Sequence, residues 1–316
     1  MNVKLLKNRS DIGAGTRGSD LGIDALEIAA INSNNDFFNR HSYIDIKTHN
    51  ETIYQKNTNS FAQRIEHVVE QCNRVCDAVA TTLNQNFFPI VLSGDHSSAL
   101  GTISGIKKAY PNKKLGVIWI DAHADIHSPY TSPSGNIHGM PLAAALGLDH
   151  THIQINQIST DTVHYWSVLK NMGVEGPKLT PNHLVYFGLR DFEPAEKQVI
   201  EAESISNYTV EKLREQGLQN TLDTIIKKLE DVDYLYVSFD VDSMDCDQIS
   251  YGTGTPVKSG FLPDEINQML HQLVLTKKII CLEIAEINPL LDNKGNKMAE
   301  TAFQILSNFE QQLTSL

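Results

Sequence analysis

The sequence predicts an α/β protein of three layers, in which a central, mostly parallel β-sheet is flanked by helices. Short apolar runs without polar–apolar alternation are typical of strands buried on both faces of a parallel sheet. Segments with helical periodicity separate these runs, and this strand–helix–strand order indicates parallel strands joined by right-handed crossovers. The apolar runs lie at residues 87–92, 115–120, 184–188, 234–239 and 279–284.

Composition narrows the class of protein and its partners. A chain of 316 residues has ample material for one large core, and we expect a single domain over residues 1–316. The formal net charge of -12 argues against a nucleic-acid or membrane partner, because those surfaces need clustered Lys and Arg. Four scattered cysteines indicate no disulfide framework, and neither a leader nor an apolar run of membrane-spanning length is found. A cytoplasmic location is therefore expected.

The first short strand, at residues 3–6, leads into the glycine-rich stretch at residues 13–18. Its spacing is G-x-G-x-x-G, the fingerprint of dinucleotide-binding loops. That fingerprint needs an apolar strand running directly into the glycines and an acidic residue about 20 residues later, at the end of a second strand. Polar residues 7–11 precede the glycines, and residues 32–36 show no strand pattern. We therefore interpret the stretch as a glycine loop before a helix at residues 22–31.

The clearest helical pattern starts at Ser60, where apolar residues recur at steps of three and four and form one buried stripe. The members of this stripe are Phe61, Ile65, Val68, Cys72, Val75, Val79 and Leu83. Further helices are expected at residues 103–109, 141–146, 165–169, 194–203, 209–229 and 263–275, with a short strand around Ile205 and a terminal helix from Ala299.

The stretch Asp121-Ala122-His123-Ala124-Asp125 directly follows the predicted strand at residues 115–120. In a continuing strand, side chains 121, 123 and 125 point the same way because the side-chain period is two. Two carboxylates and an imidazole on one side of the backbone are costly unless a cation neutralises the acids. The pattern therefore indicates a metal site at the carboxyl end of the sheet. The alternative is a polar loop whose acids cap the next helix.

Two other strand ends carry the same kinds of side chain. Asp95 and His96 follow one predicted strand, and Asp240 and Asp242 follow another. Carboxylates and imidazoles without cysteine suit a hard to borderline divalent ion such as Mn²⁺. These ligands exceed what one ion needs, whereas two ions about 3.5–4 Å apart can share bridging carboxylates. The sequence therefore favours a binuclear centre.

Five strings carry a family resemblance. They are SGDHS at 93–97, DAHAD at 121–125, SPSGNIHG at 132–139, SFDVD at 238–242 and TGTPV at 253–257. Their identity and order resemble those of the arginase family, within the ureohydrolase superfamily, over residues 87–289. SGNIHG is similar to arginases rather than agmatinases. The resemblance implies the arginase fold, which is of the α/β class predicted above.

The resemblance also implies a chemistry: hydrolysis of L-arginine to L-ornithine and urea by a hydroxide that bridges two Mn²⁺ ions, with Co²⁺ as an alternative metal. Two cations lower the pKa of bound water enough to supply hydroxide near neutral pH. Asp125 is expected to accept a hydrogen bond from that hydroxide, and His138 to shuttle a proton to the leaving amine. The implied ligands are His96, Asp121, Asp125 and Asp240 for one ion, and Asp121, His123, Asp240 and Asp242 for the other.

The substrate contacts follow from the same resemblance. Glu286, in the E-x-N-P pattern, is expected to pair with the guanidinium, whereas the rival acid Glu283 lies inside a predicted strand. His127 stands where many arginases have an Asn that contacts the α-carboxylate, and Glu193 where many have an Asp near the α-amino group. We expect L-arginine to bind with altered affinity or pH response. The expected contacts are His127, Ser134, Asn136, Glu193, Thr255 and Glu286.

Two other functions stay open. A different ureohydrolase would act on agmatine or a guanidino acid, and agmatine has no α-carboxylate that needs the loop at residues 134–138. A metal-binding regulatory protein that has lost catalysis is the second, although every implied ligand and His138 are present. Family members often form trimers or hexamers, so a homo-oligomer is compatible with the resemblance.

Overall fold

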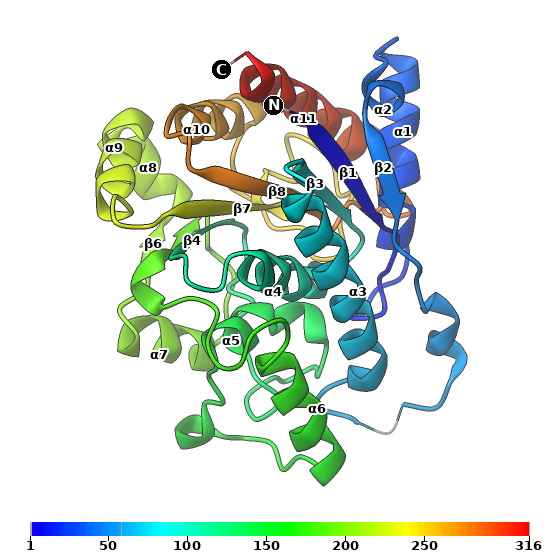
Figure 1. Ribbon diagram of the computed structural model, residues 1–316, viewed down its shortest axis with the longest axis vertical. Helices are drawn as coiled ribbons and strands as arrows, with labels where there is room; N and C mark the ends of the chain where they lie inside the picture. The colour runs from blue at the N-terminus through cyan, green and yellow to red at the C-terminus, as the bar shows by residue number, and fades with distance from the viewer. Residues whose placement is uncertain (1, 58, 316) are drawn as a thin grey trace.

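One sheet at the centre of the fold joins strands from the whole length of the chain. The computed structural model describes residues 2–57 and 59–315, and in it eight strands run parallel in the order β2-β1-β3-β8-β7-β4-β5-β6 (Figure 1). The predicted sheet is confirmed, and it is parallel throughout the described residues. The strands are β1 Val3–Asn8, β2 Ser42–Asp45, β3 Phe88–Ser93, β4 Leu115–Ile120, β5 Leu184–Phe187, β6 Ser206–Tyr208, β7 Tyr234–Asp240 and β8 Ile279–Ala285.

The central strands bury both of their faces, which is why their sequences do not alternate. In β4, Ile118 and Ile120 pack into one hydrophobic cluster, while Val117 and Trp119 pack into the other. Helices α1, α9, α10 and α11 contribute to the first cluster, and α3, α4, α5 and α6 to the second. Figure 1 shows α10 and α11 on one side of the sheet and α4, α5 and α6 on the other. The helices are α1 Gly22–Asn32, α2 Phe37–Arg40, α3 Ile65–Asn84, α4 Ala99–Ala109, α5 Pro141–Leu146, α6 Thr160–Lys170, α7 Pro194–Ala202, α8 Val210–Gln216, α9 Leu218–Lys228, α10 Pro263–Leu275 and α11 Lys297–Thr314.

Several details of the predicted elements differ from the structure. The long helix begins at Ile65 rather than Ser60, because Arg64 before it adopts a left-handed conformation with φ 57°. The single helix expected at 209–229 is two helices, since Gly217 between them has φ 82°. The edge strand β2 and the short helix α2 were not expected, because neither carries an apolar run or a helical stripe long enough to detect.

The continuation of β4 through Asp125 was also wrong. The strand ends at Ile120, and Asp125 has a left-handed φ of 49°, so the acidic stretch is an irregular loop. Its position still follows from the sheet order, because β3, β8, β7 and β4 are neighbours and their carboxyl ends lie side by side. Open parallel sheets bind ligands at this edge.

Within the described residues, every helix is too short or too polar to cross a lipid bilayer.

Candidate metal centre and substrate pocket

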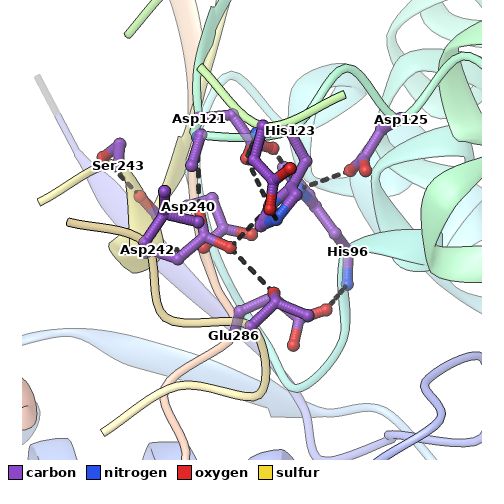
Figure 2. Close-up of polar contacts among 12 residues, drawn as sticks. His96, Asp121, His123, Asp125, Asp240, Asp242, Ser243 and Glu286 are labelled. Carbon is purple, nitrogen blue, oxygen red and sulfur yellow. Dashed lines mark hydrogen bonds and ion pairs between the residues drawn. The ribbon is translucent and has the colours of Figure 1, made fainter. Parts of the chain in front are cut away.

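The imidazole of His96 lies where three carboxylates meet. Its Nδ1 is 3.1 Å from Oδ2 of Asp121, 3.0 Å from Oδ2 of Asp125 and 3.2 Å from Oδ2 of Asp240. Its Nε2 is held 2.7 Å from the hydroxyl of Ser238 in β7. A ring nitrogen carries at most one proton, so it can donate to only one of the three carboxylates. This convergence, visible in Figure 2, therefore fits a cation between the side chains.

Asp121 belongs to a second group through its other carboxylate oxygen. Nδ1 of His123 lies 2.9 Å from Oδ2 of Asp242 and 3.6 Å from Oδ1 of Asp121. Asp121 is thus shared between an inner group with His96 and Asp240 and an outer group with His123 and Asp242. The structure groups Asp240 with His96, and its sharing with the outer group stays a prediction.

The electrostatics of these acids favour cations as well. Burial raises the pKa of Asp240, and the nearby charges of Asp242 and Asp121 raise it further. Burial also raises the pKa of Asp125 to about 6, again with a contribution from Asp121. Among the described residues, Nδ1 of His96 and Oδ2 of Asp121 are buried atoms without a well-formed hydrogen bond. Imidazole nitrogens and carboxylate oxygens in two such groups fit two hard to borderline divalent ions.

Glu286 follows β8 and connects two predicted functional residues. Its Oε1 accepts a hydrogen bond from the backbone N–H of His96 at 2.8 Å and lies 3.1 Å from Nδ1 of His138. Burial raises the pKa of Glu286, but the hydrogen bond from His138 and the charge of that ring outweigh burial and leave the pKa below its usual value. Burial lowers the pKa of His138, and the same contact outweighs it and raises the pKa to about 9. With Nδ1 engaged by Glu286, Nε2 is the nitrogen through which His138 can serve the pocket.

The rival acid Glu283 forms hydrogen bonds within the sheet and does not line the pocket. It lies inside β8, as predicted, and the structure shows that it is fully buried. Its carboxylate accepts hydrogen bonds from the hydroxyl of Ser93 at 2.6 Å and from that of Tyr236 at 2.7 Å. Both oxygens are therefore engaged within the sheet, away from the pocket.

The glycine stretch at residues 13–18 supports the candidate site. The N–H of Gly13 donates to Oδ2 of Asp95 at 2.8 Å, and its carbonyl accepts from the backbone N–H of His138 at 3.1 Å. Arg64 fixes the same loop by donating from Nε to the carbonyl of Ile12 at 2.7 Å. Asp95, identified as a strand-end acid, thus anchors the loop beside His138 and joins neither metal group. Sequence spacing contained no signal for this role.

A cavity of about 310 Å³ opens over the metal groups, within the range of about 300–1,000 Å³ common for small-molecule sites. Thr255 donates from Oγ1 to Oδ2 of Asp242 at 3.0 Å, so it also supports an expected ligand. The structure brings all the expected substrate contacts to this cavity: His127, Ser134, Asn136, Glu193, Thr255 and Glu286.

Sequence reasoning missed Glu196, which also lines the cavity. Glu193 and Glu196 form a capping box at the start of α7, with Pro194 as the first helical residue. Oε2 of Glu196 lies 3.7 Å from Nε2 of His127. The spacing E-x-x-E before an amphipathic segment was the signal that could have identified this residue.

Comparison with known proteins decides the family. The sequence model described as the arginase family matches residues 3–310. The chain belongs to the arginase family. It is 32% identical to the arginase of Bacillus caldovelox over 299 residues, which cover 94% of this chain and 93% of that protein. It is 33% identical to the arginase of Bacillus subtilis strain 168 over 302 residues, with coverage of 94% and 93%.

Solved structures agree with this assignment. The native structure of Bacillus caldovelox arginase at pH 5.6 superposes with a TM-score of 0.82 at 31% identity, covering 98% of this chain and 97% of that chain. The formimidoylglutamase of Bacillus subtilis, at 17% identity and a TM-score of 0.74, shares the fold. The family and the fold that the five strings implied are therefore confirmed.

Proposed function

We propose that this arginase-family chain hydrolyses L-arginine to L-ornithine and urea with two Mn²⁺ ions bound, Co²⁺ being an alternative metal. The observation that carries the proposal is the position of Asp121, whose two oxygens face separate imidazole–carboxylate groups, and the other members of both groups line one pocket. When bound, two such cations supply a hydroxide nucleophile near neutral pH and offset the charge of the buried acids. The proposed ligands are His96, Asp121, Asp125 and Asp240 for one ion, and Asp121, His123, Asp240 and Asp242 for the other.

Glu286 is the proposed partner of the guanidinium. It is buried, its pKa is held below the usual value by His138, and it is one of the residues that line the cavity. A fixed carboxylate matches the planar donor face of a guanidinium group. This contact would hold the guanidinium in the cavity that His123 and Asp240 also line.

Asp125 and His138 are the proposed proton-handling groups. A carboxylate oxygen of Asp125 would accept a hydrogen bond from the attacking oxygen and orient its lone pair toward the guanidinium carbon. His138 carries a proton at neutral pH because its pKa is raised to about 9 by Glu286. Transfer of that proton from Nε2 to the leaving nitrogen, with the remaining O–H proton passing to Asp125, would release the ornithine side chain as an amine and the carbon as urea.

The rim of the cavity is the proposed site for the amino-acid end of the substrate. Ser134 and Asn136 provide hydroxyl and amide donors there, and Glu193 provides a negative charge. This combination suits a zwitterion with an α-ammonium and an α-carboxylate. L-Arginine is therefore favoured over agmatine, which lacks the carboxylate.

We also propose a cytoplasmic location and a homo-oligomer, a trimer or a hexamer as in the family. The four cysteines are free and buried, which suits a reducing compartment. Light scattering on the purified protein would measure the assembly.

The test is urea release by protein loaded with Mn²⁺, measured with L-arginine, agmatine and 4-guanidinobutanoate side by side. We expect the highest kcat/KM with L-arginine. Faster turnover of agmatine or of the guanidino acid would assign the chain to another ureohydrolase activity. Absence of urea from every substrate would support a metal-binding protein without catalysis.

A further inference from the structure

Both ring nitrogens of His127 contact the protein. Nδ1 lies 3.1 Å from the hydroxyl of Thr131, and Nε2 lies 3.0 Å from Oε2 of Glu193. The backbone N–H of His127 donates to the carbonyl of Gly139 at 3.0 Å, and the residue is only 6% exposed. The ring is therefore fixed from both edges. An imidazole has no third nitrogen with which to bind a substrate carboxylate.

Glu193 presents the open side of this pair. Its side chain is 52% exposed and lines the cavity, although its carboxylate is anchored by His127 and by the first turn of α7. The pKa of the Glu193 carboxyl is lowered to about 2, mainly by the hydrogen bond from His127. A carboxylate that is both fixed and open at a pocket rim suits an ammonium group.

Glu196 contacts both members of the His127–Glu193 pair. It is 4% exposed, and its Oε2 accepts the backbone N–H of Glu193 at 3.0 Å. Burial raises the pKa of Glu196, and the neighbouring Glu193 raises it further. Burial thus disfavours a charge on Glu196, whereas Glu193 is half-exposed and is the carboxylate of the two that is open to the cavity.

We propose that His127 is a positioning residue that acts on the substrate through Glu193. The imidazole holds the Glu193 carboxylate at the rim as the receptor for the α-ammonium group, and does not itself contact the α-carboxylate. The inference rests on the proposed function, because it concerns the amino-acid end of the same substrate. The His127–Glu193 pair would therefore recognise the α-ammonium group of the substrate.

Binding without turnover tests this pairing. Calorimetry on Mn²⁺-loaded protein would use L-ornithine, 1,4-diaminobutane, which lacks the carboxylate, and 5-aminopentanoate, which lacks the α-amine. We expect His127→Leu to weaken the first two ligands about tenfold each, the loss typical of one hydrogen bond to a charged group, and to change the third less than twofold. His127→Gln, which keeps a donor for Glu193, should restore most of the affinity. In a Glu193→Gln background, His127→Leu should have no further effect.

Three other results would overturn the inference. Weaker binding of L-ornithine and 5-aminopentanoate with unchanged binding of 1,4-diaminobutane would show that His127 contacts the carboxylate directly, and would overturn the inference. It would also be overturned if the affinity losses of His127→Leu and Glu193→Gln multiplied in the double variant. Because His127, Glu193 and Glu196 also have ligand atoms within 4.8 Å of one another, a third metal equivalent that disappears in His127→Leu would overturn it too.

Two controls accompany these measurements, and urea release distinguishes failure of this inference from failure of the proposed function. His271→Asn changes an exposed histidine of α10 and should leave all three affinities unchanged. Thermal unfolding of each variant checks that the fold is kept. The predicted binding pattern without urea release from L-arginine would contradict the proposed function and leave the role of His127 standing.

Discussion

Nδ1 of His138 lies 3.1 Å from Oε1 of Glu286, and that same oxygen accepts the backbone N–H of His96. The proposed guanidinium partner, Glu286, thus connects the proposed proton donor His138 with His96 of the inner metal group. The arrangement fixes the ring of His138 with Nε2 left for the pocket. It also keeps Glu286 ionised although the residue is buried.

Replacing His138 should affect catalysis and spare the metals. His138→Ala removes the proton donor, and positioned general acids contribute about 10²–10⁴-fold, so we expect kcat to fall at least about 100-fold. Metal content by mass spectrometry should stay at the wild-type value, since His138 belongs to neither metal group. An unchanged kcat would show that His138 is not the proton donor.

Replacing Asp121 should remove both metals and activity. Each of its oxygens faces a different group, so Asp121→Ala takes a ligand from both ions at once. We expect a loss of metal affinity larger than the roughly 10–100-fold typical of a missing supporting partner. Equilibrium dialysis against Mn²⁺ measures this directly. Retention of two tightly bound ions by Asp121→Ala would be incompatible with a bridging role.

The glycine loop should tolerate no side chain at Gly13. An added Cβ would lie 2.5 Å from Oγ of Ser97 and 2.9 Å from Oδ1 of Asp95. We expect Gly13→Ala to lower the free energy of unfolding by about 1–3 kcal/mol through overpacking, and to lower kcat because the loop also holds the backbone of His138. Chemical denaturation and urea release measure the two effects.

Gly139 gives the matched stability control, since an added Cβ there meets nothing within 4 Å. Gly139→Ala should change the free energy of unfolding by no more than about 0.5 kcal/mol. Equal losses in the two variants would show that crowding at Gly13 is not the cause.

His150 should make stability depend on pH. Burial lowers its pKa to about 4 from an ordinary value of 6.5, and its Nε2 is held 2.9 Å from the carbonyl of Ile126. Because the folded state favours the neutral ring, its stability is full above pH 6.5 and falls as the pH drops from 6.5 toward 4. The loss between pH 7.5 and pH 5 from this residue is about 2 kcal/mol.

His150→Asn removes the titration and suits the left-handed backbone at this position, where φ is 57°. Urea denaturation of both proteins at pH 7.5 and pH 5 measures the difference. The variant should lose about 2 kcal/mol less than the wild type over this interval. An identical loss in both proteins would mean that His150 titrates normally.

The buried strands and the metal-binding residues were the most predictable parts of the molecule. A strand such as β4 is apolar on both faces, and the acids after it share one edge with those of β3 and β7, so residue types alone located the site. The conformation of the acidic loop was not predictable in this way, because the left-handed backbone of Asp125 depends on the surrounding packing. Its side chain still reaches His96, although not by continuing the strand.

Contacts between distant segments were out of reach of the sequence. The support that Gly13 gives to Asp95 and His138 joins residues far apart in the chain, and no local spacing encodes it. The pairing of His127 with Glu193 is of the same kind. The sequence showed that residues 127 and 193 both differ from those of many arginases. Only the structure shows that the two side chains contact each other, and this contact changes the interpretation of His127.

Metal stoichiometry and urea production measured on the same sample test the central claim most directly. Protein saturated with Mn²⁺ is predicted to hold two ions per chain and to release urea from L-arginine, with both properties lost after chelation and regained together when Mn²⁺ is restored. A single ion at saturation, or urea release that persists without bound metal, would contradict the binuclear account.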